Sequence, residues 1–143
     1  MTEEQEQAIF SLFALLKSPL WIGASAVNLQ GHSLQTYLND EVIAIHQDPL
    51  GARGGQLTES KTPCGEVWAV NLSNGGRGVV LLNRGAETCA RIVVRWAELG
   101  VEAARSASVR DLWKHKELGV FKGNFSAEGV GGMSAVVLRL NFL

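Results

Sequence analysis

The hydrophobic pattern of this chain changes at the turn sequence DPLG, which covers residues 48–51. Before this turn, apolar side chains recur at helical spacing or run without interruption, and after it they tend to alternate with polar ones. A period of 3.6 residues is typical of an amphipathic helix, and a period of two residues is typical of a half-buried strand. The sequence therefore predicts two parts of different architecture, residues 1–48 and residues 49–143.

The first part is predicted to begin with a helix over residues 3–17. Thr2 and Gln5 have the spacing of a capping box, in which a hydroxyl and an amide satisfy free backbone groups at a helix start. Apolar residues nearly encircle this helix, which favours a position packed between neighbouring elements. Pro19 ends the helix because it lacks an amide donor and restricts the residue before it.

Residues 20–23, LWIG, form a short apolar run of the kind found in parallel sheets that are covered on both faces. The first fifty residues offer no partner strand for it, because the segments that follow are predicted to be helical. These helices cover residues 33–38 and residues 41–46, and Asp40 is the expected N-cap of the second.

The second part is predicted to be an antiparallel sandwich or barrel. Runs rich in branched and aromatic side chains recur at roughly ten-residue spacing and are separated by glycine-containing turns. The clear strands cover residues 66–73, 78–84, 90–96, 107–113 and 135–142, and weaker ones include residues 119–121 and 123–128.

Charge and hydropathy exclude several classes of partner. The chain has 13 basic and 14 acidic side chains and a net charge of −1, so nucleic acid and anionic lipid are not expected partners. The apolar run over residues 8–27 is interrupted by Lys17, Ser18 and Pro19, so no membrane span is expected. The acidic start MTEEQEQ does not have the form of a secretory signal, and the compartment stays open.

No motif predicts a catalytic, substrate-binding, cofactor or metal site, and no residue is assigned to one. The three histidines, His32, His46 and His115, lack the spacing of metal ligands, and packing or surface roles are favoured. Ser73 and Ser126 lie in no nucleophile-elbow pattern. The carboxylates expected at helix starts and turns are Glu3, Glu4, Glu6, Asp40, Glu87 and Glu98.

The tryptophans raise the alternative of a sugar-stacking platform. Trp68, Trp96 and Trp113 lie in or at the ends of predicted strands, so filling the sandwich core is the favoured role.

The two cysteines and two NxS tripeptides leave questions that the sequence does not answer. Cys64 and Cys89 have no CxxC spacing and do not form a disulfide framework, so a bridge between them is the less favoured alternative. Asn71 and Asn124 fit the glycosylation pattern, which arises often by chance.

Six segments together resemble the α-galactosidases of glycoside hydrolase family 27, especially the plant and microbial-eukaryote members. They are IFSLFALLKSPLWIG, NDEVIAIHQDPLG, EVWAVNLSNG, GVVLLNRG, VRDLWKHKELGVFKGNFSAEGV and LRL, and they extend over nearly the whole chain. The resemblance implies a mainly β chain: an antiparallel Greek-key β-sandwich of about eight strands, preceded by the last helix, strand and helix of a (β/α)8 barrel.

On that template, residues 2–17 resemble the penultimate barrel helix, residues 20–23 the last barrel strand and residues 33–46 the final barrel helix. The family's two catalytic aspartates belong to motifs on earlier barrel strands, and no position in this sequence matches them. Trp21 stands where the family has a smaller aliphatic residue, and Met1 resembles an internal methionine.

Three hypotheses of function follow from the resemblance, and the least favoured is an independent enzyme, because the chain is predicted to be inactive alone without the catalytic aspartates. The first is the C-terminal part of an α-galactosidase-like glycoside hydrolase, structural in this chain, with terminal α-galactosides cleaved by the full-length enzyme. The alternative is a stand-alone module, structural, carbohydrate-binding or docked in a complex. Under the first hypothesis, a barrel-forming segment or partner protein is expected to cover residues 3–23. Members of the family are commonly secreted, lysosomal or vacuolar.

Overall fold

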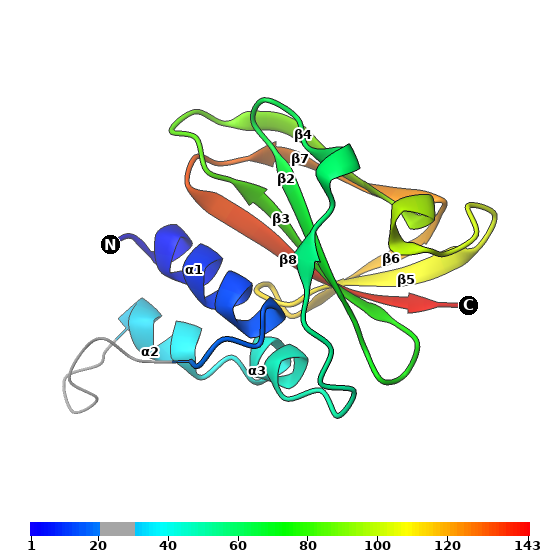
Figure 1. Ribbon diagram of the computed structural model, residues 1–143. Helices are drawn as coiled ribbons and strands as arrows, with labels where there is room; N and C mark the ends of the chain where they lie inside the picture. The colour runs from blue at the N-terminus through cyan, green and yellow to red at the C-terminus, as the bar shows by residue number, and fades with distance from the viewer. Residues whose placement is uncertain (21–30) are drawn as a thin grey trace.

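The computed structural model describes residues 1–20 and 31–143 (Figure 1). The helices are α1 (Glu3–Leu15), α2 (Gly31–Tyr37), α3 (Asp40–His46) and the short 3-10 helices η2 (Thr58–Ser60) and η3 (Trp96–Leu99). The strands are β1 (Gly55–Gln56), β2 (Glu66–Asn71), β3 (Arg77–Asn83), β4 (Cys89–Arg95), β5 (Ser106–Asp111), β6 (Lys116–Lys122), β7 (Asn124–Val130) and β8 (Ser134–Phe142).

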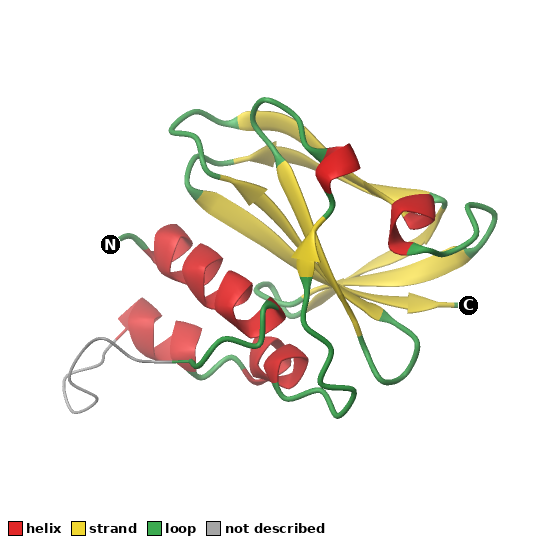
Figure 2. Ribbon diagram, in the orientation of Figure 1, coloured by secondary structure: helices red, strands yellow, loops and turns green. Residues whose placement is uncertain are grey.

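The strands form two antiparallel sheets, which confirms the mainly β, eight-stranded sandwich (Figure 2). The larger sheet has six strands in the order β1-β2-β3-β8-β5-β6, and β4 pairs with β7 in the smaller one. The two segments predicted as weaker strands belong to β6 and β7, each of seven residues.

The six-stranded sheet is the middle layer of three. On β3, Val79 and Leu81 are fully buried in the core between the two sheets, while Val80 and Leu82 pack into a second core on the other face. The second core is completed by α1 and α3, which lie on this face of the sheet together with α2 (Figure 1). The sheet is therefore covered on both sides, by helices and by the β4–β7 sheet.

Helix α1 begins as predicted and ends two residues earlier than expected. The Thr2 hydroxyl accepts a hydrogen bond from the Gln5 amide at 3.3 Å, and the Thr2 amide donates to the Gln5 side chain at 3.0 Å, which confirms the capping box. Lys17 lies outside the helix with φ of 58°, and its ammonium group donates to the carbonyls of Ile45 and His46 at the end of α3. Lys17 therefore joins α1 to α3.

The expected N-cap of α3 was wrong by one residue. Asn39 caps the helix, because its side-chain oxygen accepts hydrogen bonds from the amides of Glu41 and Val42, both at 3.1 Å. Its side-chain nitrogen also donates to the Leu112 carbonyl at 3.0 Å, a bond that the carboxylate of Asp40 could not make. The strand predicted over residues 20–23 falls outside the described residues from Trp21 onward.

A disulfide joins Cys64 to Cys89, so the sequence-based preference for two unbridged cysteines was wrong. Cys64 lies in the exposed loop before β2, and Cys89 is the buried first residue of β4. The bond therefore links the six-stranded sheet to the two-stranded sheet. Within residues 1–20 and 31–143, no helix combines the length and apolar character needed to cross a membrane.

Candidate docking surface

Helix α1 carries apolar side chains on two different faces. One face is buried against the sheet and the other helices and includes Phe10, Ala14 and Leu15. A second set recurs at positions i, i+3, i+4 and i+7, which places it on another face of the helix. We name this second set the apolar stripe; it consists of Ile9, Leu12, Phe13 and Leu16.

The apolar stripe is incompletely covered within the described part of the chain. Ile9 and Phe13 are each 42% exposed, whereas Leu12 and Leu16 are half-buried and pack against the second core. Isolated exposed apolar side chains are common on protein surfaces, whereas Ile9 and Phe13 lie one helical turn apart and form a neighbouring pair, which makes this face a candidate contact surface.

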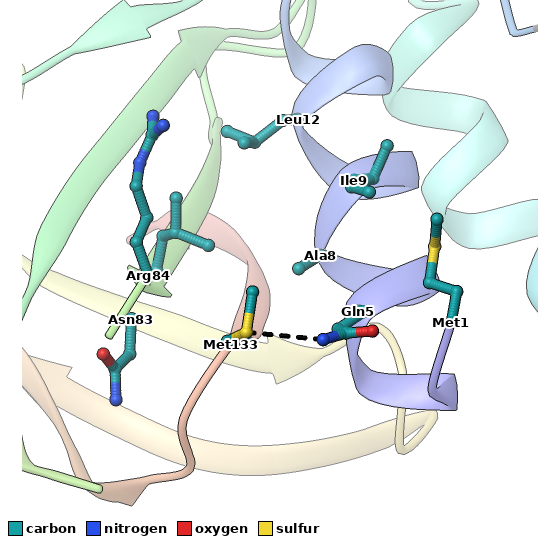
Figure 3. Close-up of a pocket in the computed structure, with 9 residues that line it drawn as sticks. Met1, Gln5, Ala8, Ile9, Leu12, Asn83, Arg84 and Met133 are labelled. Atoms are coloured by element: carbon teal, nitrogen blue, oxygen red, sulfur yellow. Dashed lines mark hydrogen bonds between the residues drawn. The ribbon is translucent and has the colours of Figure 1, made fainter. Parts of the chain in front are cut away.

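A pocket of about 520 Å³ adjoins the apolar stripe and shares Ile9 and Leu12 with it (Figure 3). On its other side lie Asn83, Arg84 and Met133, from the end of β3 and the turn before β8. The pocket is lined by Met1, Gln5, Ala8, Ile9, Leu12, Leu82, Asn83, Arg84 and Met133. Because most of these side chains are apolar, the pocket extends the apolar stripe toward the sheet.

The pocket does not have the chemistry of a catalytic site. Its polar groups are already engaged: the Gln5 amide contacts the Met133 sulfur at 3.3 Å, and Arg84 pairs with Glu66 and lies 6.0 Å from the Trp68 ring centre. The Asn83 amide donates instead to three backbone carbonyls, those of residues 87, 130 and 131. No carboxylate lines this pocket. Its arrangement therefore favours contact with an apolar surface.

A charged cluster fixes α3 against the β5–β6 hairpin. Arg110 donates to both carboxylate oxygens of Glu41, at 2.7 and 2.8 Å, and His115 lies 2.8 Å from the same carboxylate. The hydrogen bond from Arg110 is the main cause that lowers the pKa of Glu41 from 4.5 to about 2, against the opposing effect of burial. Glu41 is therefore ionised at neutral pH, and its carboxylate oxygens are engaged by Arg110 and His115.

The two other histidines and the carboxylates at the start of α1 have structural surroundings. Glu3, Glu4 and Glu6 lie in the first turn of α1 as expected, where negative charge is favourable. His46 contacts the Ser18 carbonyl at 2.9 Å, and His32 lies 3.8 Å from Glu6. In the part of the chain that the structure describes, no three His, Cys, Asp or Glu residues are grouped to hold a metal ion.

The tryptophans divide between the two cores. Trp96 is fully buried in the core between the sheets, as predicted. Trp68 and Trp113 instead pack on the helical face of the sheet, so their predicted place in the sandwich core was wrong. Trp113 donates its ring N–H to the Ser11 hydroxyl at 2.9 Å, which ties α1 to the segment after β5. Trp21 lies outside the described residues.

Ser73 and Ser126 have ordinary contacts. Ser73 donates to the Asp48 carboxylate at 3.1 Å, and the Ser126 hydroxyl accepts hydrogen bonds from Arg91. For α1, the sequence predicted that further protein covers residues 3–23, but it did not predict which face of the helix stays exposed. The spacing of the apolar stripe was visible in the sequence, but apolar residues nearly encircle α1. The pattern therefore did not indicate which face the sheet would leave open.

Comparisons with known proteins agree with this architecture. Residues 63–140 match the family described as the α-galactosidase C-terminal β-sandwich domain. α-Galactosidase 3 of Arabidopsis thaliana is 40% identical over 119 residues, which cover 82% of this chain and 27% of that protein. α-Galactosidase 2 of the same plant is 39% identical over 127 residues, covering 89% of this chain and 31% of that protein.

The whole chain also has a counterpart in a solved structure. The crystal structure of α-galactosidase I from Mortierella vinacea superposes with a TM-score of 0.90 at 29% identity and covers 98% of this chain. The match takes in 36% of the Mortierella chain, so this chain spans between about a quarter and about a third of the length of its relatives. The matched family segment contains β2 to β7 and most of β8. The chain thus belongs to the family of α-galactosidase C-terminal β-sandwich domains.

Proposed function

We propose that this chain is the non-catalytic C-terminal part of an α-galactosidase-like glycoside hydrolase. In this proposal residues 1–48 complete the wall of the catalytic barrel, and residues 49–143 form the sandwich that supports it. Hydrolysis of terminal α-galactosides is performed by the whole enzyme, through two carboxylates that this chain does not supply. The chain needs no cofactor or metal for this role.

The observation that carries the proposal is the apolar stripe on α1. The opposite side of α1 is packed on the sheet, yet Ile9 and Phe13 remain 42% exposed. An apolar face of this kind is stabilised when a further layer excludes water from it. The occupant that we propose is the remainder of such an enzyme, because this chain matches only 36% of the Mortierella chain.

The surroundings of the carboxylates support a structural role. A retaining glycosidase needs two carboxyl groups about 5 Å apart that face the same sugar. Here Glu41 is bound by Arg110 and His115, and Glu66 is bound by Arg84 and Gln56. Carboxylates held by cations and amides in this way stabilise packing between elements.

Two assays test the proposal. The purified chain is incubated with an aryl α-galactoside, and no turnover is expected. The chain is then coexpressed with the part of the Mortierella enzyme that it does not match, and a soluble complex that cleaves the substrate is expected. Turnover by the chain alone, at a level that contaminant controls do not explain, would contradict the proposal.

A matched pair of variants tests whether the apolar stripe is the contact. Ile9→Lys combined with Phe13→Lys places two charges on the stripe, so complex formation and activity should fall at least tenfold, since burying an unpaired charge costs several kcal/mol. Val120→Lys is the control, because Val120 is 60% exposed on β6 and should leave both unchanged. Equal complex formation by the two variants would exclude the stripe as the docking surface and would favour the stand-alone module.

A further inference from the structure

The tripeptide Asn124-Phe125-Ser126 lies at the start of β7, in the two-stranded sheet and not on the apolar stripe. Phe125 is buried in the core between the sheets, as is Ala127 two residues later. Because alternate residues of a strand point to opposite faces, Asn124 and Ser126 both point away from that core. The carboxamide and the hydroxyl of the tripeptide therefore share the outer face of the two-stranded sheet.

This outer face is open to solvent. Asn124 is exposed and pairs across the sheet with Arg95, which is also exposed. The Ser126 hydroxyl accepts hydrogen bonds from the Arg91 side chain at 3.0 and 3.2 Å. The β4–β7 sheet lies on the side of the six-stranded sheet opposite to the helices, so a bulky group on Asn124 would leave the apolar stripe unobstructed (Figure 1).

The disulfide is a second and independent observation about the compartment. Cys64 and Cys89 are joined, and Cys89 is fully buried where the two sheets meet. Disulfides form and persist in oxidising compartments such as the lumen of the secretory pathway, and they are rare in reducing ones. Transfer of N-linked oligosaccharides takes place in that same lumen, so a chain that acquires this bond there also meets the glycosylation machinery.

We propose that Asn124 carries an N-linked glycan. The donor is a lipid-diphosphate-linked oligosaccharide. The side-chain nitrogen of Asn124 forms a bond to the anomeric carbon of the donor's first sugar, and the bond from that carbon to the diphosphate oxygen breaks. The lipid diphosphate leaves with the electron pair, and the amide releases one proton. The hydroxyl of Ser126 is the recognition element two residues along the chain.

The test uses the protein isolated from the cells that naturally make it. Digestion with peptide N-glycosidase in heavy-oxygen water converts a glycosylated asparagine to an isotopically labelled aspartate. Peptide mass spectrometry should find the label at position 124 in most molecules, together with the intact cross-link between Cys64 and Cys89. Unmodified Asn124 in the cross-linked protein, or a natural protein in which both thiols are reduced, would overturn the inference.

Two variants made in the same cells separate glycosylation from other changes of mass. Ser126→Ala removes the recognition hydroxyl and should lower the mass by one glycan, whereas Ser126→Thr keeps the hydroxyl and should keep the glycan. Both variants retain Asn124 itself. Equal glycan content in the two would contradict the proposal. Because neither measurement depends on hydrolysis of galactosides, their outcome is independent of the proposed function.

Discussion

The Cys64–Cys89 cross-link should supply a large share of the stability of the sandwich. The two cysteines are 25 residues apart in sequence, and the loop between them contains the β2–β3 hairpin. Closing a loop of this length in the unfolded chain lowers its entropy by about 12 cal/mol/K, which corresponds to about 3.5 kcal/mol at 25 °C. Typical domains are stable by only about 5 to 15 kcal/mol, so loss of this bond should be readily measurable.

The thermal effect follows from the size of the chain. Unfolding entropies near 2.1 cal/mol/K per residue give about 0.3 kcal/mol/K for 143 residues. A loss of about 3.5 kcal/mol should therefore lower the Tm by about 12 °C. In the double variant Cys64→Ser, Cys89→Ala, the Tm should fall further, because removal of the buried Cys89 sulfur adds about 1 kcal/mol of lost packing.

Thermal and urea unfolding, followed by tryptophan fluorescence, measure this effect. The Ile9→Lys, Phe13→Lys background is used, because two lysines in place of the exposed apolar side chains should keep the chain soluble. The oxidised chain is compared with the same chain after reduction by a thiol, so that no packing is altered. A difference below about 1 kcal/mol between the oxidised and reduced forms would refute the reasoning that the cross-link acts by restricting the unfolded chain.

Two further changes test the contacts that join the layers. Asn83→Ala leaves three carbonyl groups and the Gly85 amide without their hydrogen bonds, so the free energy of unfolding measured in urea should fall by about 3 kcal/mol. Asn83→Asp should lower it by a similar amount, because a carboxylate cannot donate to the three carbonyls. The exposed Asn141→Ala should change stability by less than about 0.5 kcal/mol and is the control. The hydrogen bond from Arg110 is the main cause that lowers the pKa of Glu41 from 4.5 to about 2. The ionised Glu41 therefore contributes stability that is present above pH 4.5 and is lost as the pH falls toward 2. Glu41→Gln should flatten that part of an acid titration of stability, and an unchanged profile would show that the pair with Arg110 contributes nothing.

The pattern of branched and aromatic side chains between glycine-containing turns was sufficient to predict the strands, because such residues favour extended, packed segments. It predicted β2, β4 and β5 within two residues of their observed ends. It could not assign Trp68 or Trp113 to a core, since both faces of the six-stranded sheet are buried and alternation alone does not tell them apart. The strand order was needed to separate the two cores.

The disulfide and the cap of α3 depended on contacts distant in sequence. Cys64 and Cys89 have Cα atoms 5.4 Å apart only because the β2–β3 hairpin returns the chain to the same end of the sandwich. Asn39 and Asp40 are both suitable caps by residue type. What distinguishes them is the Leu112 carbonyl, which requires a donor and lies 73 positions further along the chain.

The layers are consistent with the proposal that one end of this fold docks against further protein and the other end does not. The β4–β7 sheet ends the stack on a polar face, where Arg91 pairs with Glu128 across the strands. At the other end, α1 covers the six-stranded sheet but presents Ile9 and Phe13 on a different face. Burial of apolar surface is the main favourable term in association, so added protein should cover α1 and leave the outer sheet in solvent. A glycan on Asn124 is compatible with that arrangement, whereas one on the apolar stripe would not be.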